Sequence, residues 1–197
     1  MRLLVVLLVL ALPFAAAYAA DGDAEALVDF LTLAIAPEGE DGQTLIEVGK
    51  AEVVQNFTNN GKPRVALFGL GNMNSVARKA AAQLVTEGYD CAVINPRFTK
   101  PLDAGTHEFF GRGADVIVTL EDHVVMGGYG SVVLELFSEQ DITTPVLRIG
   151  WPDQFIEHAT TQDELRRKYG LTAENAVARV KSLFAEAAVP VKVVDLA

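Results

Sequence analysis

The chain is organised around VIVTLEDHVVMGGYGS, residues 116–131. This stretch opens on a β-branched run, residues 116–119, which is too short and too apolar for anything but a buried strand. A glycine loop, residues 127–130, then leads into an apolar segment from Ser131 with the spacing of a helix. Between strand and loop stand three ionisable residues: Glu121, Asp122 and His123. This is half of a parallel α/β unit, in which ligands and partners gather at the carboxyl ends of strands.

The alternation of apolar runs and helical patterns continues on both sides of this stretch. Further strands are expected at residues 65–68, 92–95, 145–149 and 189–194, with an edge strand or short hairpin within 45–54. Further helices are expected at residues 23–36, 75–87, 104–111, 161–169 and 173–184. The sequence therefore predicts an α/β fold in three layers: a mostly parallel sheet of about five strands with helices on both faces.

The glycine loop has two interpretations. Its backbone amides could hold an anion, because a helix start carries unpaired N–H groups. The loop lacks the lysine of a phosphate-binding loop, however, and Glu121 and Asp122 lie just upstream, where they would repel phosphate. We therefore prefer close packing of the backbone at Gly127, Gly128 and Gly130 against a neighbouring element.

A second glycine turn, Gly69-Leu70-Gly71, has the beginning of a dinucleotide-binding pattern. Asn74 replaces the third glycine of that pattern, and Asn95 stands where an acidic residue would bind a ribose hydroxyl. A tight strand-to-helix turn is the preferred interpretation.

The proline turn at residues 96–103, PRFTKPLD, excludes a regular element, and its last residue, Asp103, suits the N-cap of the next helix. We expect Arg97, Lys100 and Asp103 to form ion pairs at a domain contact. Exposed pairs contribute little energy, so their value would lie in orientation.

Three histidines, His107, His123 and His158, have carboxylates nearby, but their spacings match no metal-ligand template. His123 is the best candidate for proton transfer because it follows two carboxylates at a strand end. A structural or interface role for it is the preferred alternative.

The composition of the chain argues against several classes of function and site. The chain has 197 residues, with 26 acidic and 16 basic side chains and a formal net charge of −10, which argues against a nucleic-acid partner. Its single cysteine, Cys91, lies in a predicted strand, so an internal disulfide and a thiolate zinc site are both excluded. We expect Cys91 to be a small core residue.

Residues 1–20 have the form of a secretory signal, in which an apolar run precedes Ala17-Tyr18-Ala19, a pattern that signal peptidase cleaves. Residues 3–20 also approach the about 18 apolar residues of a membrane anchor. A cleaved signal, an anchor and a start that is not native are the alternatives. A membrane contact is expected only if this segment remains attached.

Three blocks together resemble the C-terminal domain of 1-deoxy-D-xylulose-5-phosphate synthase, a thiamine-diphosphate enzyme related to transketolase. They are NPRFTKPLD at residues 95–103, VTLEDHVVMGGYGS at 118–131 and IGWPDQFIEH at 149–158, in the order and spacing of that family. The resemblance divides the chain into three parts: a signal-like segment at 1–20, a helix and linker at 21–44 that resemble the end of a pyrimidine-binding domain, and a transketolase C-terminal-like domain at 45–197.

The resemblance implies a reaction that this chain is not expected to perform alone. The family condenses pyruvate with glyceraldehyde 3-phosphate for isoprenoid synthesis, with thiamine diphosphate and Mg²⁺ held between the first two of its three domains. The family's G-D-G motif and its activating glutamate have no counterpart here. PEGEDGQT, residues 37–44, stands in place of the arginine segment that binds the substrate phosphate. We therefore expect no catalytic, cofactor-binding or metal-binding residue in this chain.

The leading hypothesis is a detached or truncated C-terminal domain that braces the catalytic domains of a synthase or a dimer partner. The alternative is an exported or lumenal binding module that keeps only the fold. The signal-like start indicates secretory or plastid targeting, whereas the family is cytoplasmic or plastid, so the compartment stays open. The candidates for contacts with a partner domain are Arg97, Lys100, Asp103, Glu121, His123, Gly127, Gly128 and Gly130.

Overall fold

The computed structural model describes residues 46–158 and 160–187. The chain separates into two units, and the second, Val48–Ala197, contains all the elements described below. Three predictions lie outside the described residues: the signal-like segment at 1–20, the helix at 23–36 and the strand at 189–194.

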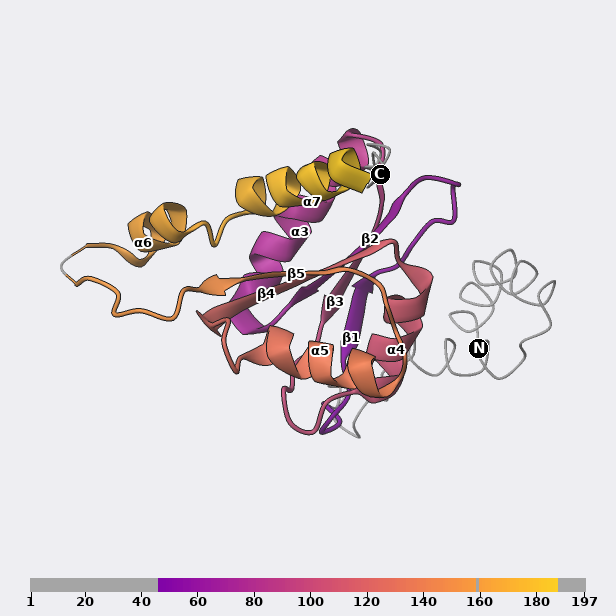
Figure 1. Ribbon diagram of the computed structural model, residues 1–197, viewed down its shortest axis with the longest axis horizontal. Coiled ribbons are helices and arrows are strands. Elements are labelled where there is room, and N and C mark those ends of the chain that lie inside the picture. The colour runs from indigo at the N-terminus through magenta and orange to yellow at the C-terminus, as the bar shows by residue number, and fades with distance from the viewer. Residues whose placement is uncertain (1–45, 159, 188–197) are drawn as a thin grey trace, which may run out of the picture. The chain divides into compact units, whose positions relative to one another are not determined.

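A five-stranded sheet in the order β1-β3-β2-β4-β5 forms the middle layer of this unit (Figure 1). Its strands are β1 (Glu52–Gln55), β2 (Arg64–Gly69), β3 (Asp90–Asn95), β4 (Val116–Val124) and β5 (Val146–Trp151). Strands β2 to β5 run parallel, whereas β1 pairs antiparallel with β3 and forms an edge. The predicted α/β fold with a mostly parallel sheet is confirmed.

Helices cover both faces of the sheet (Figure 1). On one face lie α3 (Asn74–Thr86), preceded by the 3-10 turn η1 (Gly71–Met73), and α7 (Ala173–Ala187). On the other face lie α4 (Ala104–Gly113) and α5 (Tyr129–Glu139). A further helix, α6 (Gln162–Tyr169), stands away from the sheet on the connection between β5 and α7. The predicted three layers are therefore present.

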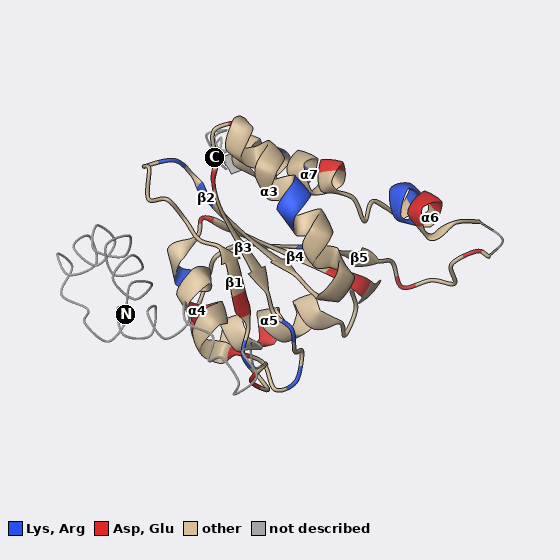
Figure 2. Ribbon diagram, turned by 180° about the vertical axis from the view of Figure 1, so that it is seen from behind, with Lys and Arg blue, Asp and Glu red and all other residues tan. Residues whose placement is uncertain are grey.

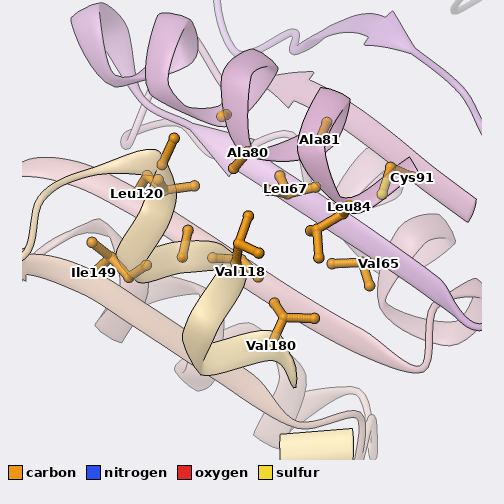
Figure 3. Close-up of a cluster of buried hydrophobic side chains, with 14 of the residues drawn as sticks. Val65, Leu67, Ala80, Ala81, Leu84, Cys91, Val118, Leu120, Ile149 and Val180 are labelled. Carbon is orange, nitrogen blue, oxygen red and sulfur yellow. The ribbon is translucent and has the colours of Figure 1, made fainter. Parts of the chain in front are cut away.

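Small side chains bring α3 close to the sheet. Ala80 and Ala81 are fully buried, and Figure 3 shows them on the helix face turned toward Leu67 of β2. Val180 of α7 belongs to the same buried cluster as these alanines. Cys91 also lies in this cluster at 1% exposure, as predicted, and burial raises the pKa of its thiol to about 12.

Two predicted bounds within residues 116–131 are wrong. The strand expected at residues 116–119 continues to Val124, because its pairing with β5 resumes, after a register irregularity, between Val124 and Trp151. The helix expected from Ser131 already begins at Tyr129. The ionisable residues 121–123 therefore lie within the strand rather than after it. The other described elements begin and end close to their predicted bounds.

Among residues 46–158 and 160–187, no helix combines the length and the apolar character that a membrane crossing requires.

Candidate functional site

All eight candidate contact residues lie at or after the ends of two strands that point the same way. Arg97, Lys100 and Asp103 come after β3, and the remaining five lie at the end of β4 or directly after it. Both strands run parallel to β2, so their carboxyl ends lie at the same edge of the sheet. We call residues 96–103 and 121–130, which lie at this edge, the docking edge.

Glu121 is fully buried at 0% exposure and caps α5 with its carboxylate. Oε2 accepts a hydrogen bond from the backbone N–H of Tyr129 at 2.6 Å, and Oε1 accepts one from Gly130 at 2.9 Å. The first amides of a helix have no partner within it and carry positive partial charge, so a carboxylate is favoured there. The anion-binding backbone considered from the sequence is thus present, and the chain's own carboxylate occupies it.

The glycines of the docking edge make this cap possible. A Cβ atom on Gly128 would lie 2.1 Å from Oε2 of Glu121, and one on Gly130 would lie 2.6 Å from Oγ1 of Thr119. Gly127 differs, because a Cβ atom there would meet no atom within 4 Å. Glycine is favoured at this position by its φ of +68°. The predicted close packing of backbone is found at Gly128 and Gly130 and is absent at Gly127.

Burial dominates the electrostatics of the Glu121 carboxyl. Loss of solvent raises its pKa above the ordinary value, although the amides of Gly130 and Tyr129 favour the charged form. The charges of His123 and Arg148 also favour the charged form.

Asp122, the next residue, makes contacts of a different kind. Its Oδ1 accepts a hydrogen bond from Nε1 of Trp151 at 2.8 Å. Its Oδ2 accepts one from Nδ2 of Asn72 at 2.8 Å and others from the side chains of Gln162 and Arg166. Burial alone would raise the pKa of Asp122, but the hydrogen bonds from Asn72, Arg166 and Trp151 lower it. This carboxylate therefore ties α6 to the ends of β4 and β5 and to the turn η1.

Helix α6 supplies two of the donors to Asp122, Gln162 and Arg166, and it has opposite charges in its first and last turns. Its first turn carries Asp163 and Glu164, and its last turn carries Arg166, Arg167 and Lys168. Figure 2 shows these acidic and basic segments side by side on α6. A capping box between Thr161 and Glu164 fixes the start of the helix.

Asp103 caps α4, as predicted. Its Oδ1 accepts a hydrogen bond from the backbone N–H of Thr106 at 3.2 Å. Its Oδ2 accepts one from the N–H of Ala51, 52 residues earlier, at 2.9 Å. The cap therefore also fixes the chain that enters β1.

Arg97 and Lys100 lie in the same turn as Asp103. Nη2 of Arg97 lies 3.1 Å from Oε2 of Glu52, so Arg97 forms an ion pair within the chain, whereas the expected ion pairs at a domain contact stay a prediction. Lys100 is exposed to solvent.

The three histidines do not come together. His123 is exposed, with Nδ1 3.1 Å from the carbonyl oxygen of Val124, and His158 is exposed on the connection before α6. His107 is fully buried; its Nδ1 lies 2.7 Å from the carbonyl oxygen of Asp103 and its Nε2 lies 2.6 Å from the hydroxyl of Tyr129. Among the described residues, no group of three or more His, Cys, Asp or Glu side chains could hold a metal ion.

The pairing of His107 with Tyr129 is the feature that sequence reasoning missed. The two residues are 22 positions apart, and nothing in either local pattern connects them. One signal was available, because His107 and Phe110 share the buried face of α4. A histidine on an apolar helix face needs a buried partner.

The docking edge does not fit thiamine diphosphate and Mg²⁺. Helix amides suited to a diphosphate already bind Glu121, and the oxygens of Asp122 already accept hydrogen bonds from side chains of this chain. Asp103 is likewise engaged with Ala51 and Thr106. The three carboxylates shape loops, and we derive no chemical step from them.

Comparison with known proteins agrees with this description. The family model described as transketolase, C-terminal domain, matches residues 49–176. The 1-deoxy-D-xylulose-5-phosphate synthase of Methylacidiphilum infernorum is 49% identical over 133 residues, which are 68% of this chain and 20% of that protein. The synthase of Acidobacterium capsulatum is 41% identical over 135 residues, 68% of this chain and 21% of that protein. The chain thus spans about a fifth of the length of these relatives.

Among solved structures, a split-gene transketolase described as an inactive beta4 tetramer superposes with a TM-score of 0.62 at 34% identity. The match covers 75% of this chain and 46% of that chain. The sheet order, the two helical layers and these matches agree: the chain belongs to the transketolase C-terminal domain family, and its relatives include 1-deoxy-D-xylulose-5-phosphate synthases.

Proposed function

We propose that this chain acts as a detached C-terminal domain of a thiamine-diphosphate-dependent 1-deoxy-D-xylulose-5-phosphate synthase and braces catalytic domains that another polypeptide carries. The observation that carries the proposal is the use of the carboxylates at the docking edge. Glu121, Asp122 and Asp103 each bind backbone or side-chain donors of this chain. Such an edge presents fixed loops to a neighbouring protein rather than reactive groups to a substrate.

The comparisons support separate chains. The chain matches about a fifth of the length of its synthase relatives, and the matching family model is that of a C-terminal domain. The structural neighbour is described as a split-gene transketolase. A transketolase-type protein can therefore consist of more than one polypeptide.

The candidate contacts divide into two groups by their exposure. Lys100 and His123 are exposed, and Met126, three residues after His123, exposes 63% of its surface. These side chains would touch the partner. Glu121 and Asp103 lie inside the domain and would act by holding the loops in place.

The test is complementation by two separate chains. The catalytic part is the Methylacidiphilum infernorum synthase without the C-terminal region that this chain matches. We expect the full chain alone, supplied with thiamine diphosphate, Mg²⁺, pyruvate and glyceraldehyde 3-phosphate, to give no turnover. Added to the catalytic part, it should bind and increase turnover. Turnover by the chain alone would refute the proposal, and absence of binding would favour a stand-alone binding module.

Surface variants locate the contact. The double variant Lys100→Ala plus His123→Ala should weaken binding by about tenfold, roughly 1.4 kcal/mol, because both side chains are exposed at the docking edge. Lys181→Ala is the matched control, since Lys181 pairs with Glu87 on the α3 and α7 side of the sheet. Equal binding by both variants would place the contact elsewhere.

A further inference from the structure

A buried polar bridge joins the starts of α4 and α5. His107 of α4 is 0% exposed and Tyr129 of α5 is 2% exposed, and Nε2 of the imidazole lies 2.6 Å from the phenol oxygen. Each helix start belongs to a different part of the docking edge. The α4 start follows the loop at residues 96–103, and the α5 start follows the loop at 125–128.

The direction of each hydrogen bond follows from the partners. A carbonyl oxygen can only accept, so Nδ1 of His107 carries the proton that it donates to the carbonyl of Asp103 at 2.7 Å. In the neutral ring, Nε2 is then an acceptor, and the hydroxyl of Tyr129 donates to it. Among the described residues, the partner of the Tyr129 hydroxyl is thus Nε2 of His107.

The groups that face His107 come from each element packed against it. Phe68 of β2 stacks on the ring with centroids 4.7 Å apart, and Tyr129 of α5 meets its edge. The Asp103 carboxylate at the start of α4 is bound to Ala51 and Thr106.

Charge nearby does not offset the loss of solvent. Glu121 of β4, whose charge acts on Tyr129, is bound to helix amides. Burial lowers the pKa of His107, although the backbone and the charge of Asp103 act in the opposite direction.

Protonation of this ring disturbs both helices at once. A cationic imidazole donates from both nitrogens, so the Tyr129 hydroxyl would have to accept from Nε2 and would lose the acceptor for its own proton. A buried donor without an acceptor, next to a buried cation, is costly. The folded bridge therefore exists with a neutral ring.

We propose that the hydrogen bond between His107 and Tyr129 is an acid-sensitive latch, which holds the starts of α4 and α5 together and opens when His107 is protonated. Opening frees the two loops of the docking edge together. The latch rests on this geometry alone and stands whether or not the chain braces a synthase.

The size of the effect follows from proton linkage. In the opened form, the solvated ring has the ordinary pKa of 6.5, whereas in the closed form its pKa is lower. At about one pH unit below 6.5, the opened form binds a proton in about ten of eleven molecules, so the opening equilibrium constant rises by up to about tenfold, the limit reached when the closed ring stays neutral.

The test is amide hydrogen exchange of the full chain at about pH 5.5 and about pH 7.5, corrected for the intrinsic exchange rates. In the wild type, we expect opening at the first turns of both α4 and α5 to increase at the lower pH, by up to about tenfold. His107→Gln should abolish this increase, because its side chain does not titrate. Tyr129→Phe should raise opening in both helices at both pH values. His158→Gln, which removes an exposed histidine, should behave as the wild type.

Several results would overturn the latch. They are a pH-independent opening in the wild type, a persistent increase in His107→Gln, or a Tyr129→Phe effect confined to α5. If His107→Gln does not fold, the wild type is used instead, and the carbon chemical shifts of its His107 ring are followed against pH by nuclear magnetic resonance. A folded protein in which that ring titrates at its ordinary value has no latch.

Discussion

Helices α4 and α5 both begin at the docking edge under a carboxylate, but the two carboxylates come from different places. Asp103 stands at the N-cap of α4 and binds Thr106, three residues ahead. Glu121 lies on β4 and binds Tyr129 and Gly130 across the glycine loop, eight and nine residues ahead. The first cap is a local feature of the chain. The second exists only after the strand, the loop and the helix have been placed.

The two caps depend on different parts of the chain. The cap of α4 needs one residue of the right type, whereas the cap of α5 needs Glu121, its burial and the absence of a side chain at Gly128. Damage to any one of these should therefore be felt at α5. The predictions below attack the remote cap first and the local cap afterwards.

The largest effect is expected from Gly128→Ala. The new Cβ atom would lie 2.1 Å from Oε2 of Glu121 and 2.3 Å from the backbone oxygen of Val124, and the backbone oxygen cannot turn aside. We expect a loss of about 3–4 kcal/mol in the free energy of unfolding, measured by urea denaturation. Gly113→Ala is the control, because a Cβ there meets no atom within 4 Å, and it should stabilise by less than about 1 kcal/mol. Equal effects at both glycines would contradict the remote cap.

Glu121→Ala removes the remote cap itself. Two amide N–H groups in a buried site lose their acceptor, so the free energy of unfolding should fall by about 3 kcal/mol in the same assay. Glu139→Ala removes an exposed carboxylate from the other end of α5 and should change stability by less than about 0.5 kcal/mol. If Glu121→Ala were as stable as the wild type, water or another group would have to accept the hydrogen bonds of these amides, and the remote cap would not stabilise α5.

Asp103→Ala should cost less, about 2 kcal/mol. It removes a helix cap and the acceptor for the N–H of Ala51, and water can reach this turn more readily than the start of α5. Asp103→Asn retains one carbonyl oxygen and should recover about half of the loss. A larger loss in Asp103→Ala than in Glu121→Ala would reverse the comparison between the two caps.

The smallest effect is a pH dependence. Burial raises the pKa of Glu121 above 4.5 in the folded chain. Between pH 4.5 and this raised pKa, the folded form therefore binds more protons than the unfolded form. Stability from this group therefore falls as the pH rises through that window, by at most about 1.4 kcal/mol per pH unit. Glu121→Gln lacks this contribution. Urea denaturation between about pH 4.5 and 6 should show the wild type losing stability relative to the variant, and a gain would contradict the raised pKa.

Local signals in the sequence predicted the elements and the local cap. Periodic apolar residues gave the strands and helices, and Asp103 before a helical pattern gave the α4 cap, because each signal and its consequence lie within a few residues. The resemblance to synthase C-terminal domains supplied the family. The family match over residues 49–176 confirms it.

Contacts between distant segments were not predictable from local patterns. The irregularity in β4 places Glu121 under α5, and the bridge from His107 to Tyr129 spans two helices. Both depend on how elements pack, which single-sequence periodicity does not specify. The contact roles of Lys100 and His123 stay predictions until a partner is measured.

The burial of Cys91 has a practical consequence for such measurements. With its thiol in the core and a pKa of about 12, the single native cysteine is poorly nucleophilic at neutral pH and shielded from alkylating reagents. A cysteine introduced at Met126 would then be the reactive thiol among the described residues and would accept a fluorophore selectively. Changes in its emission would report the arrival of a partner at the docking edge in real time.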